Sequence, residues 1–200
     1  MTSPNTTPSS PPDVTIRSIE PSDAPEVAKI WREGLSQTYQ SICNPLWKLI
    51  MFILIKQMEI KAMSKKGDVG PDGCNLVERW GGTEYPSAED SSGCKLMIVA
   101  VNNKDKKVIG FCGVKRGTDE TKDVEDKDVT DFSIWRLSVS EKARGMGLGK
   151  LLMRKTEEWA KENGGKKMIL FTGNPAASKF YVKVGYDKVS SFQHEKVLAE

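Results

Sequence analysis

The stretch Ser140–Lys150 reads SEKARGMGLGK and carries three alternating glycines, Gly145, Gly147 and Gly149. Glycine has no Cβ, so the backbone of such a stretch can approach a ligand closely and point successive N–H groups at it. Apolar residues alternate before the stretch, as in a strand, and recur at helical spacing after it. A glycine turn between a strand and a helix start, where the helix dipole favours anions, is typical of a pyrophosphate-binding turn.

Two common phosphate-binding patterns do not fit this turn. A P-loop requires a glycine five residues before the glycine of its Gly-Lys pair, and Arg144 stands there. Leu151 also stands where a P-loop has a magnesium-binding Ser or Thr. The Rossmann fingerprint G-x-G-x-x-G fails because counting from either of the first two glycines ends on Lys150 or Leu152. A nucleotide-binding protein is therefore disfavoured.

Outward from the turn, the chain predicts elements in the order β-α, insertion, β-β-β-α-β-α-β. The expected elements are strands at 14–19, 96–101, 108–114, 135–139, 168–172 and 186–189, and helices that begin near Ser22 or Asp23, at Leu148 and at Pro175. The last helix has Asn174 as a good N-cap and Gly185 as its terminator. We expect an α/β (α+β) fold, a mixed central sheet flanked by helices, in one domain over residues 14–200.

Two segments fall outside this scaffold. Residues 1–13 are rich in Pro, Ser and Thr, which predicts a disordered tail. They lack the features of a signal peptide or a transit peptide, so we expect a cytoplasmic protein. Residues 36–94 form an insertion whose apolar run, Leu49–Ile55, is shorter than the roughly 20 residues of a spanning helix. We favour buried packing or a lid over a substrate groove for this run. An interfacial membrane helix through residues 46–60 is the second interpretation, and a spanning segment is the least favoured.

Composition argues against several classes of protein. The 30 Lys and Arg against 27 Asp and Glu give a formal net charge of +3, too small for a chain that coats nucleic acid. The four cysteines form no C-x-x-C pair and the single histidine is His194, so we expect neither a metal site nor a disulfide framework. One histidine also argues against Ser-His-Asp and Cys-His catalysis. Any chemistry is expected to come from other groups.

The motif Arg144-x-x-Gly147-x-Gly149 resembles the [QR]-x-x-G-x-[GA] signature of the GNAT superfamily of acyl-CoA-dependent N-acetyltransferases. A second motif resembles a later segment of that family, N-x-x-A-x-x-[FL]-Y-x-x-x-G-[FY], and reads Asn174-x-x-Ala177-x-x-Phe180-Tyr181-x-x-x-Gly185-Tyr186. With the order of elements, the resemblance covers about residues 14–35 and 95–189. It implies the GNAT fold, and transfer of an acetyl group from acetyl-CoA to a primary amine by direct attack in a ternary complex.

The resemblance also implies roles for the residues near the turn. The pyrophosphate would lie on the backbone amides of the turn. A bulged strand before it would offer backbone groups to the pantetheine arm and to the oxyanion of the tetrahedral intermediate. Tyr181 matches the family's usual general acid, which protonates the leaving CoA thiolate; the alternative is a core aromatic. Asn174 either contacts the cofactor arm or only caps its helix. The implied cofactor-binding residues are Leu137, Val139, Arg144, Gly145, Met146, Gly147, Leu148, Gly149, Lys150 and Asn174.

The attacking amine must lose a proton, and the family often uses a glutamate or a water-held base near the central strand. Here that strand, DFSIWRLSVS, has no glutamate, which leaves Asp131, Glu33 or an ordered water. Of these, we predict Asp131 as the catalytic base. The insertion also carries Tyr39, Gln40 and Trp47. These side chains either line the amine site or are ordinary packing and surface residues.

A finer resemblance concerns the branch of the superfamily. WRLSVSEKARGMGLGKLL looks like the membrane-associated branch that acetylates cysteine S-conjugates and protein lysines, which carries an apolar insertion after its first helix. In this chain the apolar part is short and interrupted by lysines, so we favour a soluble monomer or homodimer over a membrane-surface protein. A small-molecule, peptide or protein amine is the expected acceptor, without a nucleic-acid partner. The competing interpretation is a catalytically silent acetyl-CoA sensor or binding module.

Overall fold

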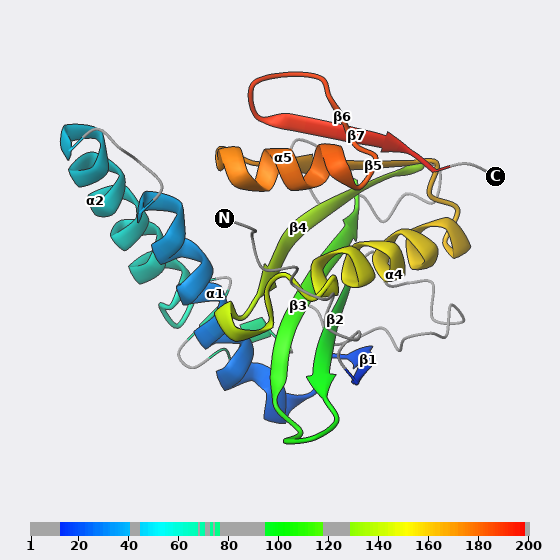
Figure 1. Ribbon diagram of the computed structural model, residues 1–200, viewed down its shortest axis with the longest axis horizontal. Helices are drawn as coiled ribbons and strands as arrows, with labels where there is room; N and C mark the ends of the chain where they lie inside the picture. The colour runs from blue at the N-terminus through cyan, green and yellow to red at the C-terminus, as the bar shows by residue number, and fades with distance from the viewer. Residues whose placement is uncertain are drawn as a thin grey trace, which may run out of the picture.

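The computed structural model describes residues 13–40, 45–67, 69–70, 73, 75–76, 95–117 and 129–198. Within them, seven strands form one mixed sheet in the order β1-β2-β3-β4-β5-β7-β6 (Figure 1). The strands are β1 (Val14–Ser18), β2 (Lys95–Asn102), β3 (Val108–Arg116), β4 (Asp131–Val139), β5 (Lys167–Phe171), β6 (Asp187–Lys188) and β7 (Gln193–Val197). The helices are α1 (Ala24–Gln40), α2 (Pro45–Ala62), α4 (Leu148–Glu162) and α5 (Pro175–Lys183), with short 3-10 turns at Pro21–Asp23 and Glu141–Ala143.

Helices cover both faces of the sheet, and β2 explains why. A strand points successive side chains to opposite faces, so the unbroken apolar run of β2 suits a strand buried on both sides. Its even-numbered residues join the core under α4 and α5, and its odd-numbered residues join the core under α1; they are Leu96, Ile98 and Ala100, and Met97, Val99 and Val101. The strands predicted at 96–101 and 108–114 are confirmed as β2 and β3, which pair antiparallel.

The entry into α1 differs from the expected N-cap at Ser22 or Asp23. A 3-10 turn, Pro21–Asp23, precedes the helix, and the Asp23 carboxylate accepts a hydrogen bond from the Glu20 N–H at 2.8 Å. The same carboxylate pairs with the Arg17 guanidinium, with Nη2 2.9 Å from Oδ1. Asp23 is only 5% exposed, so this ion pair joins the end of β1 to the start of α1. At the last residue of the expected tail, the Asp13 carboxylate accepts a hydrogen bond from the Asn103 side chain at 2.7 Å. Residues 1–12 lie outside the described residues, so the disordered tail stays a prediction.

The apolar run of the insertion forms α2, which lies at the edge of the molecule (Figure 1). Buried packing is wrong for most of this helix, in which Ile55 is buried and Met51 is half-buried. The other large apolar side chains of α2 that the structure describes are exposed, namely Leu46, Leu49, Ile50, Phe52, Ile53, Leu54, Met58 and Ile60. No helix in the described ranges is both long and apolar enough to cross a bilayer.

The C-terminal strands also differ from expectation. The strand predicted at 186–189 shrinks to β6, Asp187–Lys188, and β7 inserts between it and β5. The β7 sequence QHEKV carries little apolar character, which is why its pattern predicts no strand. His194 is nevertheless fully buried on β7, where its Nε2 lies 2.8 Å from the Ser178 hydroxyl.

Candidate active site

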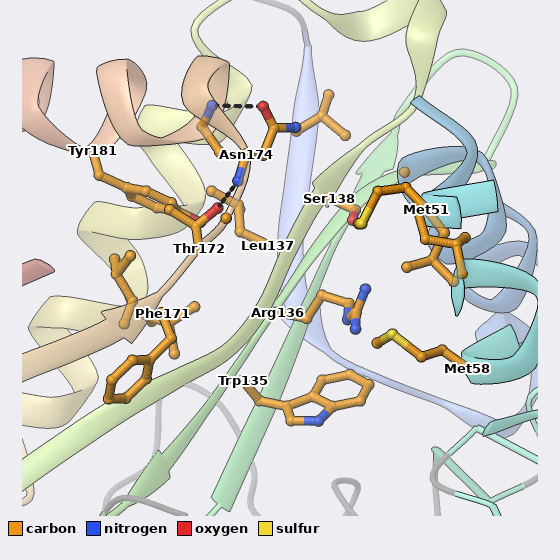
Figure 2. Close-up of a pocket in the computed structure, with 18 of the residues that line it drawn as sticks. Met51, Met58, Trp135, Arg136, Leu137, Ser138, Phe171, Thr172, Asn174 and Tyr181 are labelled. Carbon is orange, nitrogen blue, oxygen red and sulfur yellow. Dashed lines mark hydrogen bonds between the residues drawn. The ribbon is translucent and has the colours of Figure 1, made fainter. Parts of the chain in front are cut away.

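A cleft opens where β4 and β5 separate. The two strands pair in parallel at three positions, Asp131–Ser133 with Lys167–Ile169, and then diverge. In the described part of the chain, the pairing of β4 with β5 therefore ends at Ser133, while β5 pairs with β7 along its whole length, Lys167–Phe171. A cleft of about 550 Å³ lies where the two strands diverge. It is lined by β4, the segment Leu170–Asn174, α5, and parts of α1 and α2 (Figure 2).

A β-bulge in β4 re-aims its side chains at this point. Ile134 pairs with Val114 and Arg136 pairs with Gly113, so the register shifts between Gly113 and Val114, and Trp135 is the extra residue of the bulge. The bulge that the resemblance implied is thus present in the strand before the turn. Bulges bend a strand and are common beside active sites.

The glycine turn follows β4 and is fastened to it. Gly145 and Gly147 both have φ of +79°, a left-handed conformation that glycine adopts without strain. The Arg144 Nε–H donates to the Val139 carbonyl at 3.0 Å, which holds the turn against the strand end. Within the described part of the chain, the N–H groups of Gly145–Lys150 have no hydrogen-bond acceptor. They are available to an anion at the start of α4.

Gly149 brings the two sequence motifs into contact. A Cβ at this position would lie 3.3 Å from Cζ of Phe180, a tight contact, so the glycine lets α4 begin close to α5 without displacing that ring. Of the residues predicted to bind cofactor, four line the cleft: Leu137, Val139, Arg144 and Asn174. The others follow Arg144 in the turn; Leu148 points its side chain into the core, so only its backbone is available there.

Tyr181 reaches the cleft from α5 and is 8% exposed. Its ring packs edge-on against Phe180 and Tyr186, at centroid distances of 5.3 and 6.0 Å. Burial raises the pKa of the Tyr181 hydroxyl, and the positive charge of Arg136 offsets this only in part. The phenol therefore stays protonated at neutral pH and can donate a proton.

Asn174 caps α5, as one of its two predicted roles requires. Its side-chain oxygen accepts from the N–H groups of Ala176 at 2.9 Å and Ala177 at 3.4 Å. Its own N–H donates to the Thr172 hydroxyl at 3.1 Å (Figure 2). Because Asn174 also lines the cleft, the cap fixes the start of α5 beside the site.

We expect Asn174→Ala to lower the free energy of unfolding by about 1 kcal/mol, because two N–H groups of α5 lose their acceptor. Asn174→Ser keeps an N-cap oxygen and should recover most of this loss. Urea denaturation measures the stability, and the KM for acetyl-CoA should follow it, rising in the alanine variant and returning with serine. A KM that rises equally in both variants would instead indicate direct contact with the cofactor.

Asp131 does not lie in the cleft. It begins β4, where its carboxylate is 3.4 Å from Lys167 Nζ, and it is roughly 20 Å along the strand from Leu137 at about 3.3 Å per residue. Glu33 does not line the cleft either, although the next residue, Gly34, does. This placement does not support either carboxylate as the base. Among the described lining residues, the permanently charged side chains are Arg136 and Arg144.

The sequence did not predict which residues line the wall of the cleft opposite Tyr181. Met51, Ile55 and Met58 of α2 line it together with Trp135 and Arg136 of β4 (Figure 2). Two residues of the apolar run, Met51 and Ile55, thus line the cleft, and its role as a lid over a substrate groove stays a prediction. Three side chains were predicted to line the amine site, those of Tyr39, Gln40 and Trp47. The structure describes the backbone of these residues in α1 and α2 but not their side chains.

Cys112 is a buried free thiol; the other cysteines, at 43, 74 and 94, lie outside the described residues. In the parts of the chain that the structure describes, no three His, Cys, Asp or Glu side chains gather closely enough to hold a metal ion.

Residues 71–186, more than half of the chain, match the model of the Acetyltransferase (GNAT) family. The chain belongs to this family. Two solved GNAT structures are similar to it in fold. PaiA N-acetyltransferase from Thermoplasma acidophilum, in complex with coenzyme A, has a TM-score of 0.65 and 20% identity, covering 92% of this chain and 99% of that one. A GNAT acetyltransferase from Brucella melitensis, in complex with acetyl-CoA, has a TM-score of 0.53 and 13% identity, covering 94% and 89%.

A shorter match is to a curated relative of this GNAT protein. Over 52 residues the chain is 38% identical to tRNA uridine(34) acetyltransferase of Methanocaldococcus infernus, which is 26% of this chain and 10% of that protein. The chain therefore spans only a small part of this relative. The predicted fold class and the predicted GNAT acetyltransferase family are confirmed. The finer branch stays a prediction.

Proposed function

We propose that this GNAT protein transfers an acetyl group from acetyl-CoA to a primary amine, by direct attack in a ternary complex. The observation that carries the proposal is the cleft between β4 and β5, which reaches Arg144 at the start of the turn and is lined by the buried Tyr181. Acetyl-CoA needs a cleft for its long pantetheine arm and thioester, and hydrogen-bond donors for its pyrophosphate.

In this proposal the turn holds the cofactor through its backbone. The N–H groups of Gly145–Lys150 donate to the pyrophosphate, and the N-terminus of α4 adds its positive dipole. The pantetheine arm runs along the unpaired edge of β4 at Leu137–Val139, which places the acetyl carbonyl deeper in the cleft. The CoA and acetyl-CoA complexes of the two structural relatives support this choice of co-substrate.

The reaction moves one acyl group and one proton. The amine nitrogen attacks the thioester carbonyl, and a tetrahedral intermediate forms whose oxyanion requires a hydrogen-bond donor. The C–S bond then breaks, and the Tyr181 hydroxyl gives its proton to the departing thiolate. The nitrogen loses its proton to water, and that proton restores the tyrosine.

Water is the proposed proton acceptor because the described lining offers arginines and no carboxylate. Positive charge near the acceptor also disfavours its ammonium form, since like charges raise the energy of the protonated amine. The site therefore selects the neutral amine, which is the form that can attack.

The purified protein should release CoA from acetyl-CoA when supplied with an amine from a panel of amino acids, polyamines, peptides and a tRNA transcript. The acetylated product is identified by mass spectrometry. Binding of CoA without release above background for any acceptor would favour the sensor function instead. Thermal stabilisation by ATP but not by CoA would restore the nucleotide-binding alternative. A cytoplasmic location and a monomeric or homodimeric state stay predictions.

A further inference from the structure

Arg136 brings a positive charge to the side of the cleft away from the glycine turn. Figure 2 shows its side chain directed toward Met51 and Met58, while Tyr181 lies across β4. Its Cζ atom is 4.9 Å from the centre of the Trp31 ring on α1 and 5.5 Å from that of Trp135. The guanidinium therefore stands between two helices and the strand, within the cleft.

The bulge in β4 determines this direction. Ile134 and Leu137 pack on the core under α4 and α5, whereas Trp135 packs on the core under α1. In a regular strand Arg136 would share a face with Ile134, because side chains alternate. With Trp135 inserted, Arg136 instead turns to the face of α1 and stacks on Trp31. A guanidinium held by indole rings loses little further freedom when it binds a ligand.

The charges around the cleft favour an anionic group on the acceptor. Arg136 and Arg144 are the permanently charged side chains among the described lining residues, and Arg144 is fastened to Val139 beside the turn. These residues include no carboxylate that could bind a polycationic acceptor. A carboxylate finds the planar fork of an arginine, which binds it through two parallel hydrogen bonds.

The rest of this wall is apolar and adaptable. Met51, Ile55 and Met58 project from α2 beside Arg136. Methionine side chains are flexible and fill irregular gaps, so they suit an apolar body of variable shape. The wall combines one cation with an apolar surface.

We propose that Arg136 binds the carboxylate of the acceptor, and that the acceptor is a small amino carboxylate with an apolar body. This inference rests on the proposed acetyl transfer and names its substrate class. Arg136 is a specificity-determining residue in this scheme, and its charge also keeps the attacking amine in its neutral form.

The test compares L-leucine with L-leucinamide, which share the amine and the apolar body but differ in the carboxylate. The amide group makes the neighbouring amine less basic, so the free amine is more abundant in leucinamide and any bias opposes the prediction. We expect kcat/KM to be at least about 10-fold higher for leucine, and Arg136→Met to lower the leucine-to-leucinamide ratio by about 10- to 100-fold, as hydrogen bonds to charged groups imply. The KM for acetyl-CoA should stay within about twofold.

Arg154→Met is the matched control, because Arg154 is 63% exposed on α4, outside the cleft, and loses the same charge. Its ratio should equal that of the wild type, and Arg136→Lys should recover part of the preference. Equal kcat/KM for both acceptors, or a ratio unchanged in Arg136→Met, overturns the inference while acetyl transfer stands. If no amine is acetylated, the proposed function fails. Calorimetry of leucine binding to the CoA complex then tests the role of Arg136. Leucine binding that is lost in Arg136→Met supports the role, and no leucine binding in the wild type refutes it.

Discussion

Replacing Tyr181 by phenylalanine is expected to lower kcat about 100-fold or more, with little change in the KM for acetyl-CoA. The variant keeps the ring and its packing against Phe180 and Tyr186, and removes only the proton that the thiolate needs. General acid catalysis contributes roughly 100- to 10,000-fold in enzymes, which sets the size of the loss. Steady-state kinetics with acetyl-CoA and the best amine of the panel measure both constants.

Tyr186→Phe is the control for this variant, because it deletes the same hydroxyl from a buried ring whose centroid lies 6.0 Å from that of Tyr181. Tyr186 does not line the cleft, so kcat should be unchanged. Equal losses in the two variants would show that the core has been disturbed and that Tyr181 is not the acid. A Tyr181→Phe enzyme with full activity would assign proton delivery to water.

The pH profile gives a second measure of the same residue. Because burial raises the pKa of Tyr181, its acid form persists beyond the ordinary tyrosine value of about 10. Activity that requires the protonated phenol is lost only as pH rises through the raised value. We therefore expect kcat/KM to increase with pH as the amine loses its proton, with no falling limb below pH about 10. Such a limb near neutrality would argue against Tyr181 as the acid.

Local features of the site could be predicted from the sequence, whereas its non-local geometry could not. The glycine turn and the Asn174 cap depend on backbone preferences of a few consecutive residues, so their patterns are visible in one dimension. The position of the bulge, at Trp135, is a difference in register between β3 and β4, which are separated by 14 residues of sequence. No pattern within β4 alone specifies it, so the position of Arg136 in the cleft could not be deduced.

Asp131 and β7 illustrate the same limit. Asp131 belongs to the correct strand, but the point where β4 leaves β5 decides which residues enter the cleft, and Asp131 lies before that point. The polar sequence of β7 becomes a strand because β5 and β6 supply hydrogen-bond partners on both sides, as Leu170 opposite His194 shows. Tertiary pairing here overrides a weak local preference.

Gly147→Ala is expected to raise the KM for acetyl-CoA at least about 10-fold. At φ of +79°, a Cβ costs about 1–2 kcal/mol of backbone strain, so the turn is expected to relax away from its present shape. A Cβ at Gly147 meets nothing within 4 Å in the free protein, so the protein itself has room for it. The cost falls on cofactor binding, because relaxation re-aims the N–H groups that the pyrophosphate requires.

Gly164→Ala separates this effect from a general loss of stability. Gly164 follows the far end of α4, has φ of +80°, and likewise has nothing within 4 Å of an added Cβ. The backbone penalty in the two variants is therefore nearly equal, and thermal unfolding should shift by similar amounts. Only Gly147→Ala should weaken acetyl-CoA, as measured by calorimetry and by KM. If both variants weaken it equally, the turn acts through stability alone and the pyrophosphate lies elsewhere; if neither does, the amides of Gly145–Lys150 do not hold the cofactor.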